Sequence, residues 1–484
     1  MILTSIFFIL FFGLFILFYI PTGNNKILKT FSLFLASTVL ILSCCLLVQF
    51  DCTSYYFQHV ITYSLGSDLL TLFFSFGVDG VSIFFFILTS FLVFLCVLFI
   101  WHENSFKEYI LNLFLIELLL LLVFSALDIF LFYIFFEAIL IPMFILIGVW
   151  GSRERKIRAV YLLFFYTLFG SLLMLIGLLY IYSITGTLNM EHLLTWNFTF
   201  QEQCCLWLAF FISFASKIPM FPFHVWLPEA HVEAPTIGSV LLAGILLKLG
   251  VYGFLRFSLS LFQEASLFFS PLVYLLSIIG IIYASLTAIR QTDLKRIIAY
   301  SSVAHMNVVT LGIFSFNIVG LEGSILQSVS HGFVASAMFL LIGILYNRYH
   351  SRLLYYYGGL VHMMPIYSML LLIFTMANIA LPGTSSFVGE FLLLSGIYKT
   401  NVLSSIVGTT GVILCGAYSL WLYNRIVFGN LKIVYITKFK EINALEFSVL
   451  APLLVLVIFM GIYPSFFADF IHLSTCNLFF ISLS

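Results

Sequence analysis

Continuous runs of about 20 apolar residues, separated by short polar stretches, dominate the chain. A run of this length crosses the hydrocarbon core of a bilayer as an α-helix, whereas the strands of a transmembrane barrel alternate apolar and polar residues. The pattern therefore predicts an all-α polytopic membrane protein with about fourteen transmembrane helices. These helices are expected at residues 2–20, 30–50, 79–101, 109–127, 129–150, 157–182, 204–223, 235–259, 271–289, 295–317, 322–346, 365–397, 402–427 and 447–470.

The distribution of basic residues supports this helix count. Sixteen of the 20 Lys and Arg residues, Lys295 among them, fall in loops that follow odd-numbered helices. If one helix were missed or invented, every later loop would change sides and this bias would be lost. The positive-inside rule then places both termini on the outer side. The segment after the seventh helix is an exception, because Glu229, His231 and Glu233 make it acidic.

The composition excludes several classes of protein. Of the 484 residues, 63% are hydrophobic and only 8% are charged, against about 25% charged residues in soluble domains. This composition excludes a soluble enzyme, a secreted disulfide scaffold, a disordered protein and a nucleic-acid binder. The eight cysteines form no C-x-x-C pair, which favours apolar packing over metal or iron–sulfur binding. Residues 1–20 contain no Lys or Arg, so we interpret them as a first membrane helix.

Ionisable residues interrupt several of the apolar runs. A charge at the centre of a bilayer costs at least about 2.5–3.5 kcal/mol, so such residues either form static ion pairs or serve a proton or ion path. Their presence on many helices favours the path. The candidate residues are Glu137, Lys217, Lys248, His305, His331 and Glu390. Glu117 and Asp128 lie nearer to helix ends, where a structural role and a functional role remain equally open.

Prolines break two of the predicted helices. Pro219 and Pro222 lie in the seventh, and Pro382 lies in the twelfth. A proline has no N–H, so Pro219 leaves the Ala215 carbonyl and Pro382 leaves the Asn378 carbonyl without a helical donor. Broken helices at corresponding places in two halves of a chain indicate a transport site near the membrane midplane.

The breaks lie five helices apart, which predicts an inverted repeat. Because five is odd, two tandem five-helix units enter the membrane from opposite sides. The prediction is one membrane domain with helices 1–3 at residues 1–108, a first repeat at 109–260, a second repeat at 261–428 and a C-terminal helix at 429–484.

Several motifs resemble a known family. They are FFEAILIPMFILIGVWG, SKIPMFPFHVWLPEAHVEAPT, SVLLAGILLKLGVYGFLRF, AYSSVAHMN and LPGTSSFVGEF. Over roughly residues 75–430 the chain closely resembles the subunit 4 family of mitochondrial NADH:ubiquinone oxidoreductase (respiratory complex I). This is an antiporter-like family of membrane subunits, related to subunits of multisubunit cation/proton antiporters.

The resemblance implies fourteen helices with inverted five-helix repeats and a proton-transfer role for the candidate residues. It implies that Glu137 pairs with Lys217 on the first broken helix and that Lys248 is the central lysine. His305 and His331 would continue a hydrated axis that ends at Glu390 on the second broken helix. The family signature also contains His224, Glu229 and His231, for which the sequence gives no firm chemical role.

The resemblance further implies a proton-translocating subunit with no redox chemistry of its own. We expect no cofactor or metal in this chain, and we expect NADH, FMN, Fe–S clusters and ubiquinone in other subunits. The expected partners are neighbouring antiporter-like and small membrane-arm subunits and the lipid bilayer, with no nucleic acid. The expected location is the mitochondrial inner membrane, with the chain encoded in the organelle.

Three alternatives remain at this point. The chain could be a cation/proton antiporter subunit of the same superfamily, or a membrane subunit of a hydrogenase complex. It could also be a quinone- or haem-binding redox protein that uses His305 and His331 as axial ligands.

Overall fold

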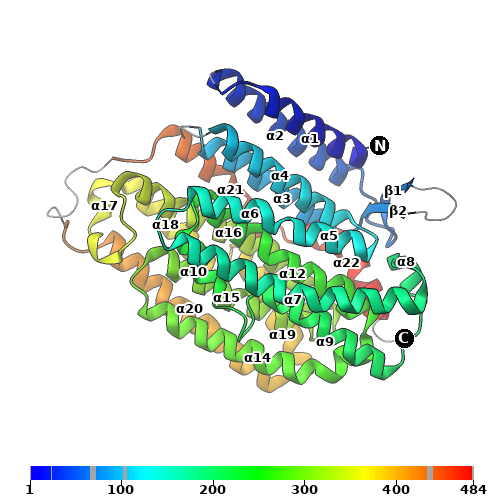
Figure 1. The fold of residues 1–484 in the computed structure, drawn as a ribbon. Coiled ribbons are helices and arrows are strands. Elements are labelled where there is room, and N and C mark those ends of the chain that lie inside the picture. Colours follow the sequence, from blue (N-terminus) through cyan, green and yellow to red (C-terminus); the bar gives the residue numbers. More distant parts are fainter. Residues whose placement is uncertain (1, 23, 66–71, 102–105, 433–439, 482–484) are drawn as a thin grey trace.

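A computed structural model describes residues 2–22, 24–65, 72–101, 106–432 and 440–481, and helices form most of it (Figure 1). Eleven helices of this described part are long and apolar enough to cross a membrane. They are α1 (Ile2–Tyr19), α2 (Asn25–Val48), α3 (Ser82–Phe99), α4 (Phe106–Ser125), α5 with α6 (Ile129–Ala138 and Leu140–Trp150), α7 (Lys156–Thr185), the span Thr236–Leu261, α14 (Gln263–Arg290), α16 (Ile318–Tyr349), α20 (Val402–Val427) and α21 (Ala444–Ile462).

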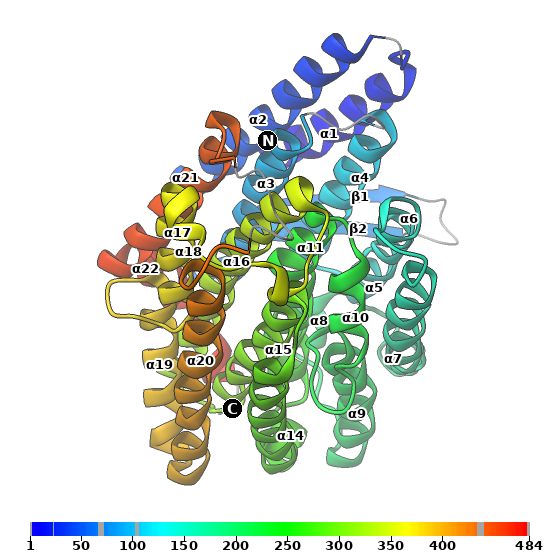
Figure 2. The ribbon, with the colours of Figure 1, turned by 90° about the vertical axis from the view of Figure 1, so that its left-hand side faces the viewer.

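Each of the fourteen predicted runs overlaps one or two of the observed helices, except the run 235–259, which overlaps a helix of five consecutive segments. The three runs outside the group of eleven are the polar or broken ones. They correspond to α9 (Phe200–Lys217), α15 (Leu294–Ile313), and α18 with α19 (Pro365–Asn378 and Ser385–Thr400). The helices pack side by side in one bundle, and α1 and α2 lie at its margin (Figures 1 and 2). The helical fold class is as predicted.

The seventh helix is longer than predicted and consists of two parts. After α9 ends at Lys217, the chain turns through the prolines and continues as α10 (Trp226–Glu233). Protein groups satisfy the carbonyls that the break releases, since the Met220 N–H donates to the Ala215 oxygen (3.2 Å). The Trp226 indole N–H similarly donates to the Ser216 oxygen (2.8 Å). The prediction that this helix ends at residue 223 and a loop follows was therefore wrong.

The position of α10 explains the acidic exception to the charge pattern. Glu229 forms a 2.7 Å ion pair with Arg296, and Glu233 lies 4.0 Å from Arg352. These carboxylates thus lie beside the basic residues of the loops that follow the ninth and eleventh helices.

The eighth helix contains two π-helical turns. It runs through α11 (Thr236–Leu241), η1 (Leu242–Leu246), α12 (Leu247–Gly253), η2 (Phe254–Ser258) and α13 (Leu259–Leu261). A π turn widens the helix by one residue and disturbs its i→i−4 hydrogen bonds. Lys248 is the second residue of α12, and its side chain reaches back to the carbonyl of Ala243 in η1.

The twelfth helix is broken at Pro382, as predicted. Between α18 and α19 the backbone passes through the left-handed region at Ala380 (φ 65°) and Gly383 (φ 92°). The break places the N-terminus of α19 inside the bundle, five residues before Glu390.

Some elements had no counterpart in the predictions. An antiparallel hairpin pairs β1 (Gln58–Leu65) with β2 (Leu72–Val78), with Thr62 opposite Ser75. The last predicted helix ends at Ile462 before Pro464, and a separate helix, α22 (Ser465–Ile481), follows. Short helices complete the described chain, namely α8 (Met190–Leu193), η3 (Leu354–Tyr356) and α17 (Leu360–Met363).

A buried ion pair connects α3 to the eighth helix. Asp79 lies 2.8 Å from Arg256, whose guanidinium also stacks on the Phe57 ring at 4.6 Å. The Asp79 carboxylate also accepts a hydrogen bond from the Ser82 N–H (3.0 Å), so it anchors the start of α3.

Candidate functional site

Lys248 and His331 meet in the centre of the bundle. The Lys248 ammonium lies 2.9 Å from His331 Nδ1 and also donates to the carbonyl of Ala243 in the π turn η1. Both side chains are almost fully buried, at 0% and 3% exposure. His331 stands on α16, which is buried continuously from Gly323 to Leu345. Two of the six candidates, from different helices, are therefore in direct contact.

His305 and Glu390 form the next contact. His305, on α15, places Nδ1 2.9 Å from the Glu390 Oε1 atom on α19. The same carboxylate oxygen accepts a hydrogen bond from the Gln327 amide (3.1 Å). The ring centroids of His305 and His331 are 5.9 Å apart. Four candidates thus follow one another in the order Lys248, His331, His305, Glu390.

The first half of the candidate axis is more open. Lys217 is the last residue of α9, and its ammonium lies 4.3 Å from the centre of the Phe136 ring, a cation–π geometry. Within the described residues no ion pair of 4.0 Å or less joins Lys217 to Glu137. The implied pair is therefore not closed in this conformation.

Asp128 and Glu117 differ in their surroundings. Asp128 caps α5, accepting from the N–H groups of Phe130 (2.8 Å) and Leu131 (3.4 Å), which is a structural role. Glu117 is fully buried in α4, and neither carboxylate oxygen has a hydrogen-bond partner in the described part of the chain. Its role stays open.

The signature histidines pack against aromatic rings. His231 is completely buried and stacks on Phe339 with ring centroids 4.6 Å apart. The ring centroid of His224 lies 5.7 Å from that of Phe221 and 5.3 Å from that of Tyr283. These contacts fit a role in holding α10 against α16 and α14.

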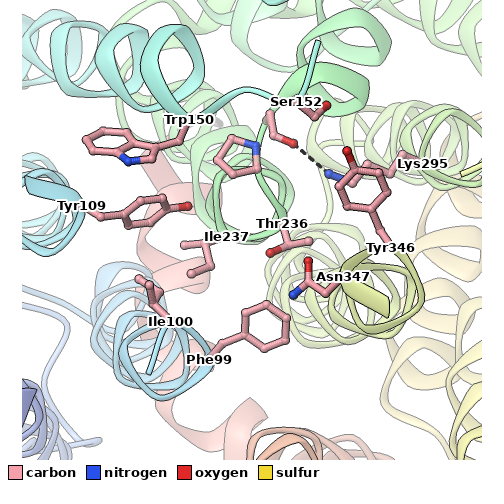
Figure 3. A pocket seen from close by; sticks show the side chains of 12 residues that line it. Phe99, Ile100, Tyr109, Trp150, Ser152, Thr236, Ile237, Lys295, Tyr346 and Asn347 are labelled. Atoms are coloured by element: carbon pink, nitrogen blue, oxygen red, sulfur yellow. Dashed lines mark hydrogen bonds between the residues drawn. The ribbon is translucent and has the colours of Figure 1, made fainter. Parts of the chain in front are cut away.

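A cavity of about 200 Å³ lies outside this axis (Figure 3). At its wall, Lys295 donates to the Ala234 carbonyl (2.8 Å) and to the Ser239 hydroxyl (3.4 Å). Lys295 was counted with the basic residues of the loop after the ninth helix and is also the first residue of the predicted helix 295–317. It lies in the first turn of α15 and is 1% exposed, so its place in the loop was wrong. The basic pair Lys295-Arg296 is typical of a loop sequence, and the sequence alone gives no sign of the contacts that bury Lys295 between α10 and α11. The lining includes Phe99, Tyr109, Trp150, Ser152 and Tyr346.

Residues 126–415 match the family described as the transmembrane part of NADH:quinone oxidoreductase and Mrp antiporter proteins. The chain belongs to this family. All six candidate residues lie within the matched range.

Members of the family with known names cover nearly the whole chain. NADH-ubiquinone oxidoreductase chain 4 of Chondrus crispus is 52% identical over 96% of this chain and 95% of its own length. The protein of the same name from Marchantia polymorpha is also 52% identical, over 96% and 94%. NADH-quinone oxidoreductase subunit M of Rhodobacter capsulatus is 47% identical over 85% and 83%.

Two solved structures share the fold. A chain of respiratory complex I from Thermus thermophilus with bound NADH superposes with a TM-score of 0.87 at 28% identity, covering 100% of both chains. A chain of the Mrp complex from Dietzia gives a TM-score of 0.86 at 19% identity, covering 100% of this chain and 99% of that one, and so shows the fold alone. The predicted antiporter-like helical fold and the predicted family are both confirmed.

Proposed function

We propose that this chain is a proton-translocating membrane-arm subunit of NADH:ubiquinone oxidoreductase, of the chain 4 type. The names and the high identity of its relatives support the assignment to that complex. The observation that carries the proton-transfer role is the buried series Lys248, His331, His305 and Glu390, in which successive groups touch or face one another.

The series suits proton transfer because every member can hold or release a proton. In the hydrogen-bonded pair Lys248–His331 a proton passes directly between two nitrogens, and in the pair His305–Glu390 it passes between a nitrogen and an oxygen. Between the two rings, a rotation of the His331 ring or one water molecule that reaches His305 Nδ1 bridges the remaining distance. Glu390 is the terminal carboxylate of this sequence of transfers.

Lys217 and Glu137 supply the control of the transfer. Their pair is open in this structure, and its closure would place opposite charges together and change the electric field at Lys248. Lys248 has no carboxylate within 4.0 Å in the described part of the chain, so its proton responds directly to that field.

The energy for transport comes from other subunits in this proposal. Moving one charge against 100 mV costs about 2.3 kcal/mol. Redox reactions of NADH, FMN, Fe–S clusters and ubiquinone in those subunits supply this work, and this chain carries no redox step itself. Neighbouring antiporter-like and small membrane-arm subunits contact its two ends. The complex lies in the mitochondrial inner membrane, and the organelle encodes the chain.

The test uses the intact complex in sealed vesicles with NADH and a quinone. Replacement Lys248→Ala is expected to lower proton translocation and coupled NADH oxidation by at least about 10-fold, because it removes the central proton carrier. Lys399→Ala is the matched control, since Lys399 is an exposed lysine at the end of α19. Normal proton translocation by assembled Lys248→Ala complex would refute the proposal.

A cation/proton antiporter subunit is the second candidate, because the family that matches residues 126–415 is described by Mrp antiporter proteins as well as by NADH:quinone oxidoreductase. Transport that requires sodium, in the absence of any quinone-reducing arm, would decide for it. A hydrogenase subunit would copurify with a nickel–iron partner. The haem alternative is disfavoured because Glu390 and Cys415 occupy both ring nitrogens of His305, leaving none for iron.

A further inference from the structure

The break in the twelfth helix leaves one buried carbonyl that needs a donor. Pro382 lacks the N–H that would bond to the Asn378 oxygen in a continuous helix. The neighbouring amides bond elsewhere, with Ala380 N–H directed to Ala377 and Leu381 N–H to Met376. An unsatisfied carbonyl inside a membrane protein costs several kcal/mol, so the Asn378 oxygen requires a hydrogen-bond donor from a neighbouring helix.

The thiol of Cys415 on α20 is the donor that reaches this carbonyl. Its Sγ atom lies 3.3 Å from the backbone oxygen of Asn378, and the Cys415 residue is 4% exposed. A thiol has one hydrogen, so once that hydrogen points to Asn378 the sulfur can only accept other hydrogen bonds. The Tyr418 hydroxyl donates to the sulfur at 2.9 Å.

The same sulfur faces the proton-transfer series. Cys415 Sγ lies 3.5 Å from Nε2 of His305, on the side of the ring opposite Glu390. A sulfur that can only accept requires a hydrogen on this nitrogen. His305 is therefore held between an acceptor on one side and a carboxyl group on the other.

We propose that Cys415 is a positioning residue that keeps the Nε2–H tautomer of His305, so that Nδ1 is the nitrogen that exchanges a proton with Glu390. This inference rests on the proposed function of the His305–Glu390 pair and adds a residue and a direction to it. In the transfer, a proton leaves Glu390 Oε1 and binds Nδ1, giving a carboxylate and an imidazolium, while Nε2 keeps its hydrogen throughout. The reverse step restores the starting state.

The groups around His305 are consistent with this assignment. The titratable and polar side chains that face it or its partners come from five helices: Ser301 on α15, His331 and Gln327 on α16, Asn378 on α18, Glu390 on α19, and Cys415 and Tyr418 on α20. The Gln327 amide donates to Glu390, and the Tyr418 hydroxyl donates to Cys415. Without the sulfur, Nε2 would lose its acceptor and the two neutral tautomers would compete.

The test compares cysteine variants in the intact complex. Cys415→Ala is expected to lower proton translocation about 10-fold, and Cys415→Ser is expected to restore it to within about 2-fold because a hydroxyl keeps both the donor and the acceptor. Cys96→Ala is the matched control, since Cys96 is equally buried but lies on α3. It is expected to leave the rate unchanged.

A double-mutant cycle separates positioning from simple packing. In a His305→Gln background, Cys415→Ala is expected to cause no further loss, because the thiol acts through the ring. An equal loss in both backgrounds, or no loss on Cys415→Ala alone, would overturn the role of Cys415 while leaving the pair intact. Full activity of His305→Gln itself would instead overturn the proposed role of His305.

Infrared difference spectra test the direction of the thiol hydrogen. Subtraction of the Cys415→Ala spectrum isolates the S–H stretching band of Cys415. Because the hydrogen points to Asn378, this band is expected to keep its position in His305→Gln complex. A shift of the band on that replacement would show that the hydrogen points to His305, which contradicts the proposed tautomer.

Discussion

His305 Nδ1 lies 2.9 Å from Glu390 Oε1, although the two residues are 85 positions apart in the chain. They come from α15 and α19, which pack against each other and against the central helix α16. An imidazole and a carboxyl group in this geometry can share one proton, and both are at least nine-tenths buried. The contact therefore joins His305 on α15 to the last member of the proposed transfer series, Glu390, on the helix that follows the second break.

Replacement Glu390→Gln is expected to lower proton translocation at least about 10-fold, since an amide cannot take up the transferred proton. The amide still offers an oxygen to Gln327, so the complex is expected to assemble. Proton uptake by vesicles during NADH oxidation measures the effect. Glu322→Gln is the control, because that carboxylate pairs with the exposed His472. Unchanged uptake in Glu390→Gln vesicles would remove Glu390 from the path.

The Glu137 and Lys217 replacements are expected to act as one unit. Glu137→Gln and Lys217→Met should each lower coupled NADH oxidation about 10-fold, and the double variant should be no slower than the worse single one. The physical reason is that each residue affects Lys248 through the closure of their shared ion pair. Steady-state oxidation rates of all three variants decide the point, and additive losses would show that the two residues act independently.

The Asp79–Arg256 ion pair is expected to stabilise the chain far more than the Glu229–Arg296 pair. The side chains of the first pair are 10% and 7% exposed, whereas those of the second are 30% and 33% exposed. Asp79→Ala leaves a buried guanidinium unpaired and should cost about 3–5 kcal/mol, against about 0–1 kcal/mol for Glu229→Ala. Thermal unfolding of the purified complex measures both, and equal effects would contradict the prediction.

The close contact between α16 and α19 depends on Gly396. A Cβ atom there would lie 2.6 Å from the backbone of Gly320, and the Gly396 carbonyl accepts a 2.6 Å hydrogen bond from Asn317. Gly396→Ala is therefore expected to cost about 1–3 kcal/mol through overpacking and to slow proton transfer by displacing Glu390. Gly148→Ala is the control, since no atom lies within 4 Å of its Cβ position. Thermal unfolding and proton uptake are the two measurements.

The sequence indicates the membrane helices and the buried ionisable residues for one physical reason. Hydrocarbon penalises polar groups so strongly that runs of apolar residues must be spans, and charges within them stand out. The helix break at Pro382 was also predictable, because proline lacks the N–H that a helix needs. The helical membrane fold class and the candidates Lys248, His305, His331 and Glu390 follow from these signals, whereas the family came from the resemblance of several motifs.

Other features depend on tertiary contacts that no local pattern records. The helix α10 contains a proline and three charged or titratable residues, so it reads as a loop until Arg296 and Arg352 are seen beside it. Cys415 looks like one of eight ordinary apolar cysteines, and only the approach of α20 to the second break gives it a partner. The open distance between Glu137 and Lys217 depends on side-chain conformation, which residue types alone do not specify.

The unbroken course of α16 has a mechanical consequence. His331 and Gln327 lie one helical turn apart on the same face of this rod, the former touching Lys248 and the latter touching Glu390. A translation or rotation of α16 by about 1 Å would lengthen the His331–Lys248 and Gln327–Glu390 contacts together. One displacement of α16 therefore changes proton transfer at the middle and at the far end of the series together. Because α16 is buried between Gly323 and Leu345, a partner can act on it only through its ends.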